Sequence, residues 1–269
     1  MRLFIASALM LALAALQSCS VNKADINNDL KKYFDAKNVD GSFTLLDNTD
    51  GSIMVYNMAL DTMRQLPAST FKIVNALIAL QTGIAPNDSF SIAWDGVKRR
   101  AEWDQTMNMR QAFKVSNVPY FQQLAKRIGR DTMQRWIDSL GYGNKNIGTV
   151  IDSFWLNNSL KISPDEQLGL MKHLYFDQLP FRKSVMETVR SMMVQEENTL
   201  YKLSYKTGWG FDEQKSNIGW MVGWIEENKH VYFFVTLIKS PSPDIDMPTV
   251  RLAITRDILK DLGFLQGKK

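Results

Sequence analysis

One stretch of this chain is apolar on nearly every side of a helix, and it constrains the fold more than any other feature. Between Thr70 and Thr82 almost every position is apolar, and Gly83 follows as a helix-ending residue. A helix of this kind is buried, because no face of it gains from contact with water. The sequence therefore predicts a central helix enclosed by other elements, and 269 residues are enough to build such a core.

Periodic patterns place strands at both ends of the chain and helices in its middle. An amphipathic helix is predicted over 26–34, and an Asp50-Gly51 turn joins the strands of a hairpin. Helical patterns then predominate, and no strand is expected between Pro86 and Glu196. The expected strands are 43–46, 53–56, 203–209, 218–225 and 231–238, and the expected middle helices are 107–115, 119–128, 131–140, 163–174 and 185–194.

A last helix is predicted to begin at Pro248 and to end near Gly263. Together these elements predict an α+β fold: an antiparallel sheet flanked by N- and C-terminal helices, with an all-helical subdomain inserted over roughly 84–198.

The first residues have the features of an export signal. Met1-Arg2 precede an apolar run from Leu3 to Leu16 that is too short to span a bilayer. The run ends in Leu-Gln-Ser-Cys, which resembles a bacterial lipobox, although Gln17 departs from the small residue usual there. Cys19 is the only cysteine, so no intramolecular disulfide can form.

These features set the expected organisation of the chain. We expect a signal peptide over 1–19 with lipidation at Cys19, a tether over 20–24 and one catalytic domain over 25–269. Ordinary signal-peptidase cleavage near an incidental cysteine is the alternative. The protein is expected to be exported to the periplasm, and a lipid on Cys19 would tether it to the membrane.

Charge and metal-binding residue types exclude several classes of function. The net charge is +4, and the only dense basic run, Lys98-Arg99-Arg100, is interpreted as a solvated face rather than a nucleic-acid site. Two histidines and one cysteine do not support a clustered zinc site, so no metal is expected.

Ser69 and Lys72 are the strongest candidates for chemistry. Their spacing puts both side chains on one face of the helix entry. Spacing alone proves little, because Ser20 and Lys23 have the same spacing in the polar tether. Burial and the helix dipole both favour the neutral amine of Lys72, which could then act as a base for the Ser69 hydroxyl. A capping serine followed by a lysine that reaches the surface is the alternative.

A Ser-His-Asp arrangement fits the sequence poorly. His173 lies inside a predicted helix and His230 lies beside a turn, so both are interpreted as structural. No Gly-x-Ser-x-Gly elbow occurs in the chain.

Reading outward from Ser69, the chain resembles the class D serine β-lactamases of the oxacillinase type along nearly all of its mature length. Several short motifs occur in the order and spacing of that family. They are Ser69-Thr70-Phe71-Lys72, Ser116-Asn117-Val118, Tyr142-Gly143-Asn144, Phe154-Trp155-Leu156, Lys206-Thr207-Gly208 and Arg251.

The resemblance assigns roles around the serine. It implies that Ser69 is the nucleophile and that CO₂ converts Lys72 to N6-carboxylysine, a general base for both acylation and deacylation. Ser116 would relay a proton to the departing nitrogen. Trp155 would donate its indole N–H to the carbamate, and Val118 and Leu156 would shield it.

The resemblance also assigns substrate-binding residues. Lys206, Thr207 and Arg251 would anchor the substrate carboxylate, and the backbone N–H groups of Ser69 and Trp209 would form the oxyanion hole. Gly208, on a strand, is expected to leave room for the substrate to approach the backbone.

The expected activity is hydrolysis of β-lactam antibiotics without a metal or bound cofactor. A sensor domain that stays acylated and a penicillin-binding transpeptidase are the alternatives, and both monomer and homodimer remain open. Glu166 is not the deacylating glutamate of class A enzymes: it belongs to a capping box, Ser163-Pro164-Asp165-Glu166.

Overall fold

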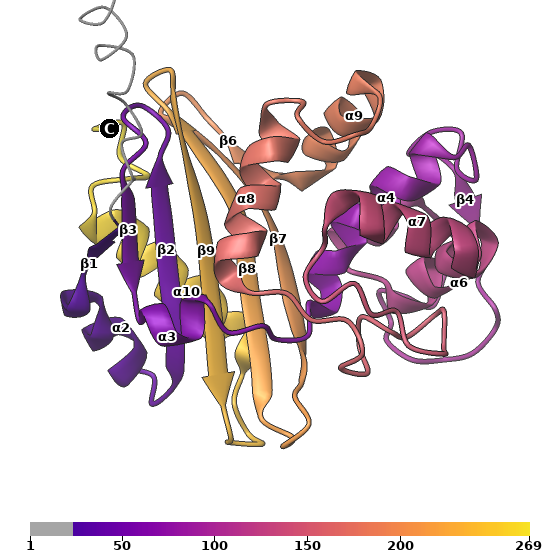
Figure 1. Ribbon diagram of the computed structural model, residues 1–269, viewed down its shortest axis with the longest axis horizontal. Coiled ribbons are helices and arrows are strands. Elements are labelled where there is room, and N and C mark those ends of the chain that lie inside the picture. The colour runs from indigo at the N-terminus through magenta and orange to yellow at the C-terminus, as the bar shows by residue number, and fades with distance from the viewer. Residues whose placement is uncertain (1–23) are drawn as a thin grey trace, which may run out of the picture.

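The computed structural model describes residues 24–269, and within this range seven strands form one sheet (Figure 1). Their order across the sheet is β1-β3-β2-β9-β8-β7-β6. β1 runs parallel to β3, and the other neighbours are antiparallel. The strands are β1 Ala24–Ile26, β2 Asp40–Asp47, β3 Ile53–Tyr56, β6 Val194–Glu197, β7 Tyr201–Phe211, β8 Asn217–Glu227 and β9 His230–Ser240.

The helices occupy both faces of the sheet and most of the middle of the chain. Two short 3-10 helices, η1 Asn28–Leu30 and η2 Ala68–Phe71, precede α-helices. The α-helices are α2 Lys31–Asp35, α3 Met58–Asp61, α4 Lys72–Gln81, α5 Met109–Lys114, α6 Val118–Ile128, α7 Arg130–Leu140, α8 Pro164–Tyr175, α9 Lys183–Met193 and α10 Met247–Asp261. The predicted α+β fold is confirmed.

Two hydrophobic cores lie on opposite faces of the sheet. On one face α2 and α10 pack against the strands, with Phe34 and Ile258 fully buried between them (Figure 1). On the other face α8 covers the sheet, and the larger core continues from there into α4, α6 and α9. The active-site elements lie at the boundary between the sheet and this second core.

The central helix is confirmed. Every residue of α4 from Lys72 to Leu80 is buried, although the helix begins two residues later than Thr70. The preceding turn is the 3-10 helix η2, which contains Ser69. This change of helix type separates the serine from the regular helix that carries the lysine.

Short strands were not predicted. Ala24 and Ile26, expected in the tether and the first helix, belong to β1 and pair with β3. The expectation of no strand between Pro86 and Glu196 was wrong, because β4 Ser91–Ile92 pairs with β5 Met107–Asn108 and β6 begins at Val194. Strands of two to four residues contain too few alternations to give a pattern.

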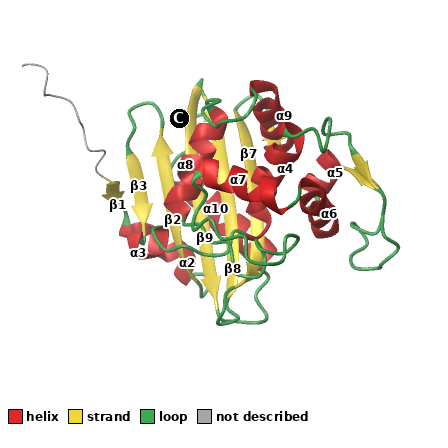
Figure 2. Cartoon of the chain, turned by 45° about the vertical axis from the view of Figure 1, so that its right-hand side comes forward, coloured by secondary structure: helices red, strands yellow, loops and turns green. Residues whose placement is uncertain are grey.

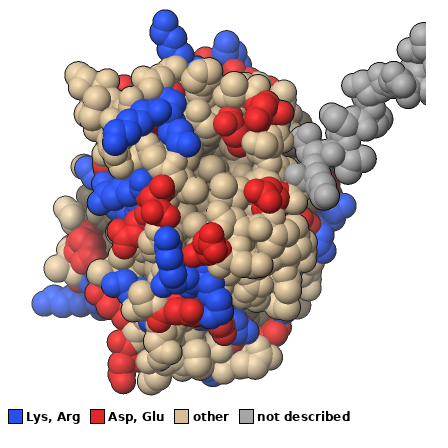
Figure 3. All heavy atoms as spheres, turned by 90° about the vertical axis from the view of Figure 1, so that its left-hand side faces the viewer, with Lys and Arg blue, Asp and Glu red and all other residues tan. Residues whose placement is uncertain are grey.

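The surface of the described residues is mixed in charge. On the face that includes β1 and α2, acidic and basic side chains are interspersed (Figure 3). No helix within residues 24–269 is long and apolar enough to cross a membrane. The expected signal peptide and Cys19 lie outside the described residues.

Packing between β7 and β8 makes Gly223 a sensitive position. An added Cβ would lie 2.1 Å from the backbone oxygen of Ser204 on β7. We expect Gly223→Ala to lower the free energy of unfolding by about 1–3 kcal/mol through overpacking. Gly169 in α8 has nothing within 4 Å of its Cβ position, so Gly169→Ala should raise stability by about 0.5–1 kcal/mol. Urea denaturation measures the free energy of unfolding of both variants. If the two variants were equally stable, this packing would be contradicted.

Candidate active site

The turn that carries Ser69 is fixed by contacts from three elements. Ala68 has a left-handed backbone, with φ of 48°, and its N–H donates to the backbone oxygen of Trp155 at 3.1 Å. Gln167 on α8 donates from Nε2 to Thr70 Oγ1 at 2.7 Å. A left-handed alanine persists only where surrounding contacts hold it. Ser69 is therefore presented in one orientation.

Lys72 is the base candidate, and its amine lies deep in the protein. The side chain is fully buried, and Nζ lies 2.5 Å from Ser69 Oγ and 3.3 Å from Ser116 Oγ. Burial holds the pKa of Lys72 well below its usual range, and the positive charges of Lys206 and Arg100 lower it further. The geometry thus brings together the two residues singled out in the sequence, with the neutral amine favoured.

Ser116 links this pair to a second lysine. Its backbone is also left-handed, with φ of 56°, and Lys206 Nζ lies 3.0 Å from Ser116 Oγ. Burial, followed by the charge of Arg251, lowers the pKa of Lys206 to about 7. Ser69, Lys72, Ser116 and Lys206 therefore form a continuous hydrogen-bonded path along which protons can move.

Trp155 is fully buried and leaves one polar atom unused. Its ring stacks on Phe71, the residue before Lys72, at 5.5 Å between centroids. Among the described residues Nε1 has no hydrogen-bond partner. Because a buried donor without an acceptor is costly, this indole N–H is available to an added acceptor. Val118 and Leu156 are partly buried, and Val118 lines the cleft beside Ser69.

Arg251 reaches from α10 to strand β7. Its Nη1 donates to the backbone oxygen of Gly208 at 2.6 Å, while Nε is buried without a partner among the described residues. Burial lowers the pKa of Arg251 to about 10, so the side chain stays charged at neutral pH. A cation with a free donor is suited to a carboxylate.

Gly208 packs closely against the turn η2. A Cβ there would lie 3.0 Å from the backbone oxygen of Pro67 and 3.2 Å from Thr70 Cγ2. The absent side chain thus lets β7 pack against the turn η2. The expected room for a substrate at the backbone of Gly208 stays a prediction.

A cleft of about 350 Å³ opens beside the serine. Its lining residues come from the sheet, from α10 and from the helical region, and Figure 2 shows α5 and α6 of that region to one side of the sheet. The residues that line it are Ser69, Arg100, Trp103, Lys114, Val115, Ser116, Val118, Thr207, Trp209, Pro248 and Arg251. Arg100, Trp103, Lys114, Val115 and Pro248 were not named as site residues. Lys98, Arg99 and Arg100 are all exposed, in agreement with their interpretation as a solvated face, and Arg100 in addition lines the cleft.

Residues set aside in the sequence lie outside the cleft. Glu166 caps α8 by accepting from the backbone N–H of Ser163 at 3.0 Å, and it also pairs with Arg64, so the capping-box prediction is confirmed. Neither His173 nor His230 lines the cleft. Within residues 24–269 no group of three His, Cys, Asp or Glu side chains is placed to hold a metal.

Known proteins share both the sequence and this arrangement. Residues 14–260 match the family described as penicillin binding protein transpeptidase domain. The probable beta-lactamase YbxI of Bacillus subtilis (strain 168) is 40% identical over 248 residues, which cover 91% of this chain and 87% of that protein.

Solved structures extend the similarity to the whole fold. FUS-1 (OXA-85), a class D beta-lactamase from Fusobacterium nucleatum subsp. polymorphum, has a TM-score of 0.85 at 36% identity, covering 90% of this chain and 100% of that one. The C-terminal domain of the Bacillus licheniformis BlaR penicillin-receptor has a TM-score of 0.84 at 31% identity, and the match covers 91% of this chain and 99% of that domain's chain. With the fold, the ordered motifs and these relatives in agreement, the chain belongs to the class D β-lactamase family within the penicillin-binding transpeptidase group.

Proposed function

We propose that this protein hydrolyses β-lactam antibiotics by two-step acyl transfer through Ser69. The observation that carries the proposal is the buried Lys72 amine, 2.5 Å from Ser69 Oγ. A serine hydroxyl is a weak nucleophile at its ordinary pKa, and a neighbouring base corrects this. The low pKa of Lys72 favours the form that can accept the proton.

Ser69 then attacks the lactam carbonyl, and the C–N bond of the ring opens. The leaving nitrogen needs a proton, and Ser116 lies within reach of both Lys72 and Lys206 to supply it. We infer that the backbone N–H groups of Ser69 and Trp209 hold the oxyanion that forms in each step. Lys206, Thr207 and Arg251 bind the substrate carboxylate.

The surroundings of Lys72 fit a carbamate formed with CO₂. The unpartnered Nε1 of Trp155 supplies a donor, and Val118 and Leu156 supply an apolar wall. As N6-carboxylysine, Lys72 would supply the general base for both acylation and deacylation. The neutral amine that burial favours is also the form that reacts with CO₂.

A β-lactam sensor is the second candidate function, and the similarity of the chain to the BlaR receptor domain supports it. In a sensor the acyl-enzyme would persist; in a transpeptidase, the third candidate, a peptidoglycan stem peptide would replace the β-lactam as substrate. Sustained turnover of a chromogenic β-lactam supports hydrolysis, whereas a single stoichiometric burst would favour the sensor.

We also propose that the protein is exported and works in the periplasm. The apolar segment over 3–16 supports export, and the Leu-Gln-Ser-Cys sequence ending at Cys19 supports a lipid tether. Intact mass of the mature protein from membranes separates lipidation at Cys19 from simple cleavage.

Loss of the nucleophile gives the first test. Ser69→Ala should abolish covalent labelling by a penicillin, because no other hydroxyl lies as close to the Lys72 amine. Intact-protein mass spectrometry measures the acyl adduct. Ser184→Ala, a change at an exposed serine, should be labelled like the wild type. Normal labelling of Ser69→Ala would refute the mechanism.

The state of Lys72 gives a pH test. Protonation removes the base, so turnover should rise as pH increases through the lowered pKa of Lys72 and fall as pH decreases. Added bicarbonate should raise turnover in CO₂-depleted buffer, most strongly on the acid side where less amine is neutral. Turnover independent of bicarbonate at every pH would contradict the carbamate.

The indole N–H of Trp155 gives a third test. Trp155→Phe keeps the stacked ring but removes the free donor, so deacylation should slow by about 10–100-fold, the range measured for loss of an outer hydrogen bond at metal sites. Mass spectrometry should show an accumulated acyl-enzyme, and bicarbonate should restore part of the rate. Trp136→Phe, which changes a tryptophan stacked on Phe181, is the matched control. Equal deacylation rates in both variants would refute the role of Trp155.

A further inference from the structure

Two basic side chains on the helical side of the cleft have no contact with substrate assigned to them by the mechanism. Arg100 lies on the loop between β4 and β5, Lys114 lies at the end of α5, and both line the cleft that contains Ser69. Neither forms an ion pair with a carboxylate of the described residues. The adjacent Arg99 differs, because it pairs with Asp95 at 2.8 Å. An unpaired cation in a binding cleft is available to an anionic ligand.

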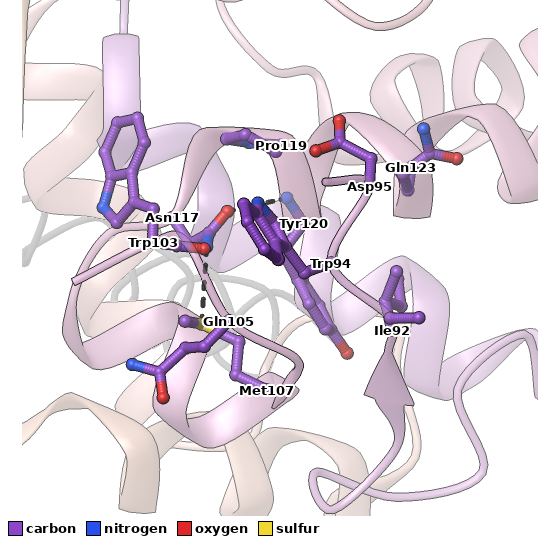
Figure 4. A pocket seen from close by; sticks show the side chains of 11 residues that line it. Ile92, Trp94, Asp95, Trp103, Gln105, Met107, Asn117, Pro119, Tyr120 and Gln123 are labelled. Carbon is purple, nitrogen blue, oxygen red and sulfur yellow. Dashed lines mark hydrogen bonds between the residues drawn. The ribbon is translucent and has the colours of Figure 1, made fainter. Parts of the chain in front are cut away.

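The guanidinium of Arg100 is held in place by its neighbours. It stacks over the ring of Trp103 at 4.7 Å from the centroid, and Trp103 Nε1 donates to the backbone oxygen of Val115 at 3.0 Å. Asn117 donates from Nδ2 to the backbone oxygen of Trp103 and to Met107 Sδ, each at 3.4 Å (Figure 4). An anchored indole thus orients the charge before any ligand arrives, which lowers the entropy lost on binding.

The charge of Arg100 affects the pKa of a residue inside the site. Burial is the main cause of the low pKa of Lys72, but Lys206 and Arg100 lower it further. The positive charge of Arg100 therefore reaches the Lys72 amine at the bottom of the cleft. None of the described residues that line the cleft is acidic, so nothing in the lining offsets this field.

The shape of a β-lactam determines which part of it lies near Arg100 and Lys114. In a penicillin the carboxylate lies on the five-membered ring, and the acylamino side chain leaves the opposite end of the bicycle. When Thr207 and Arg251 hold the carboxylate on the sheet side, the acylamino side chain points away from them. The helical side, with Arg100 and Lys114, is the remaining wall of the cleft.

We propose that Arg100 and Lys114 form a second anion subsite, which recognises a carboxylate on the acyl side chain of a dianionic β-lactam. The inference rests on the proposed function, because it takes the orientation of the substrate from it. The subsite discriminates in binding, not in chemistry. Since both cations are exposed, their attraction is screened by salt and is modest.

Benzylpenicillin and carbenicillin form a suitable pair of probes, because they differ only by a carboxylate on the acyl side chain. Arg100→Gln combined with Lys114→Gln should lower the kcat/KM ratio of carbenicillin to benzylpenicillin by about three- to tenfold, through KM. Raising salt from about 0.05 to 0.5 M should lower the ratio in the wild type and have little effect in the double variant. Arg99→Gln is the matched control and should keep the wild-type ratio, because its guanidinium pairs with Asp95.

Binding measurements separate failure of the subsite from failure of the proposed function. In a Ser69→Ala background, calorimetry gives the Kd of both penicillins with and without the two glutamine substitutions. If the wild type hydrolyses neither penicillin but the Kd ratio shifts, the hydrolytic function fails and the subsite stands. A Kd ratio and a kcat/KM ratio that both stay within twofold of the parent would overturn the subsite.

Discussion

The fully buried amine of Lys72 is the constraint on which the rest of this site depends. A buried ammonium without a counter-charge is too costly to persist, so the group is driven toward its neutral form. Burial acts on the neighbouring cations too: together with the charge of Arg251 it lowers the pKa of Lys206 to about 7, and it lowers the pKa of Arg251 to about 10. No described residue lining the cleft is acidic, so the cations of the lining are available to an anionic ligand. An anionic substrate therefore completes the site electrostatically.

The residues around such a site must hold backbone conformations that are unfavourable by themselves. Ala68, which precedes the nucleophile, and Ser116, the proton relay, both have left-handed backbones, each costing about 1–3 kcal/mol. Buried groups supply the contacts that hold these conformations. Trp220 Nε1 donates to the backbone oxygen of Leu66 at 2.9 Å, and Gln167 on α8 donates to Thr70. The apolar helix α4 fixes Lys72 from the other side. The large core thus serves the chemistry directly, because it prevents the strained turn from relaxing.

Long patterns in the sequence predicted the fold well. Short strands, and contacts between segments that are far apart in the sequence, were not predicted. The buried helix α4, the amphipathic middle helices and the capping box at Glu166 follow from local rules, and each is present. β1 and the pair β4–β5 were missed because two or three residues make no pattern, and their pairing partners lie far away in sequence. The packing of Gly208 against the turn η2 was also missed, because a contact between a strand and a distant turn cannot be read from local sequence.

Arg99 and Arg100 show most clearly where local inference ends. Both belong to one basic run, and both have a partner at helical spacing: Asp95 lies four residues before Arg99, and Trp103 lies three residues after Arg100. The sequence could suggest either contact, but it could not say which contact faces the cleft. That direction is set by Asn117 and Val115, which fix Trp103 against the turn between α5 and α6 that contains Ser116. One arginine is neutralised on the loop, and the next is presented unpaired to the substrate. Substrate preference can therefore change through the anchoring of a single indole, with the catalytic residues unaltered.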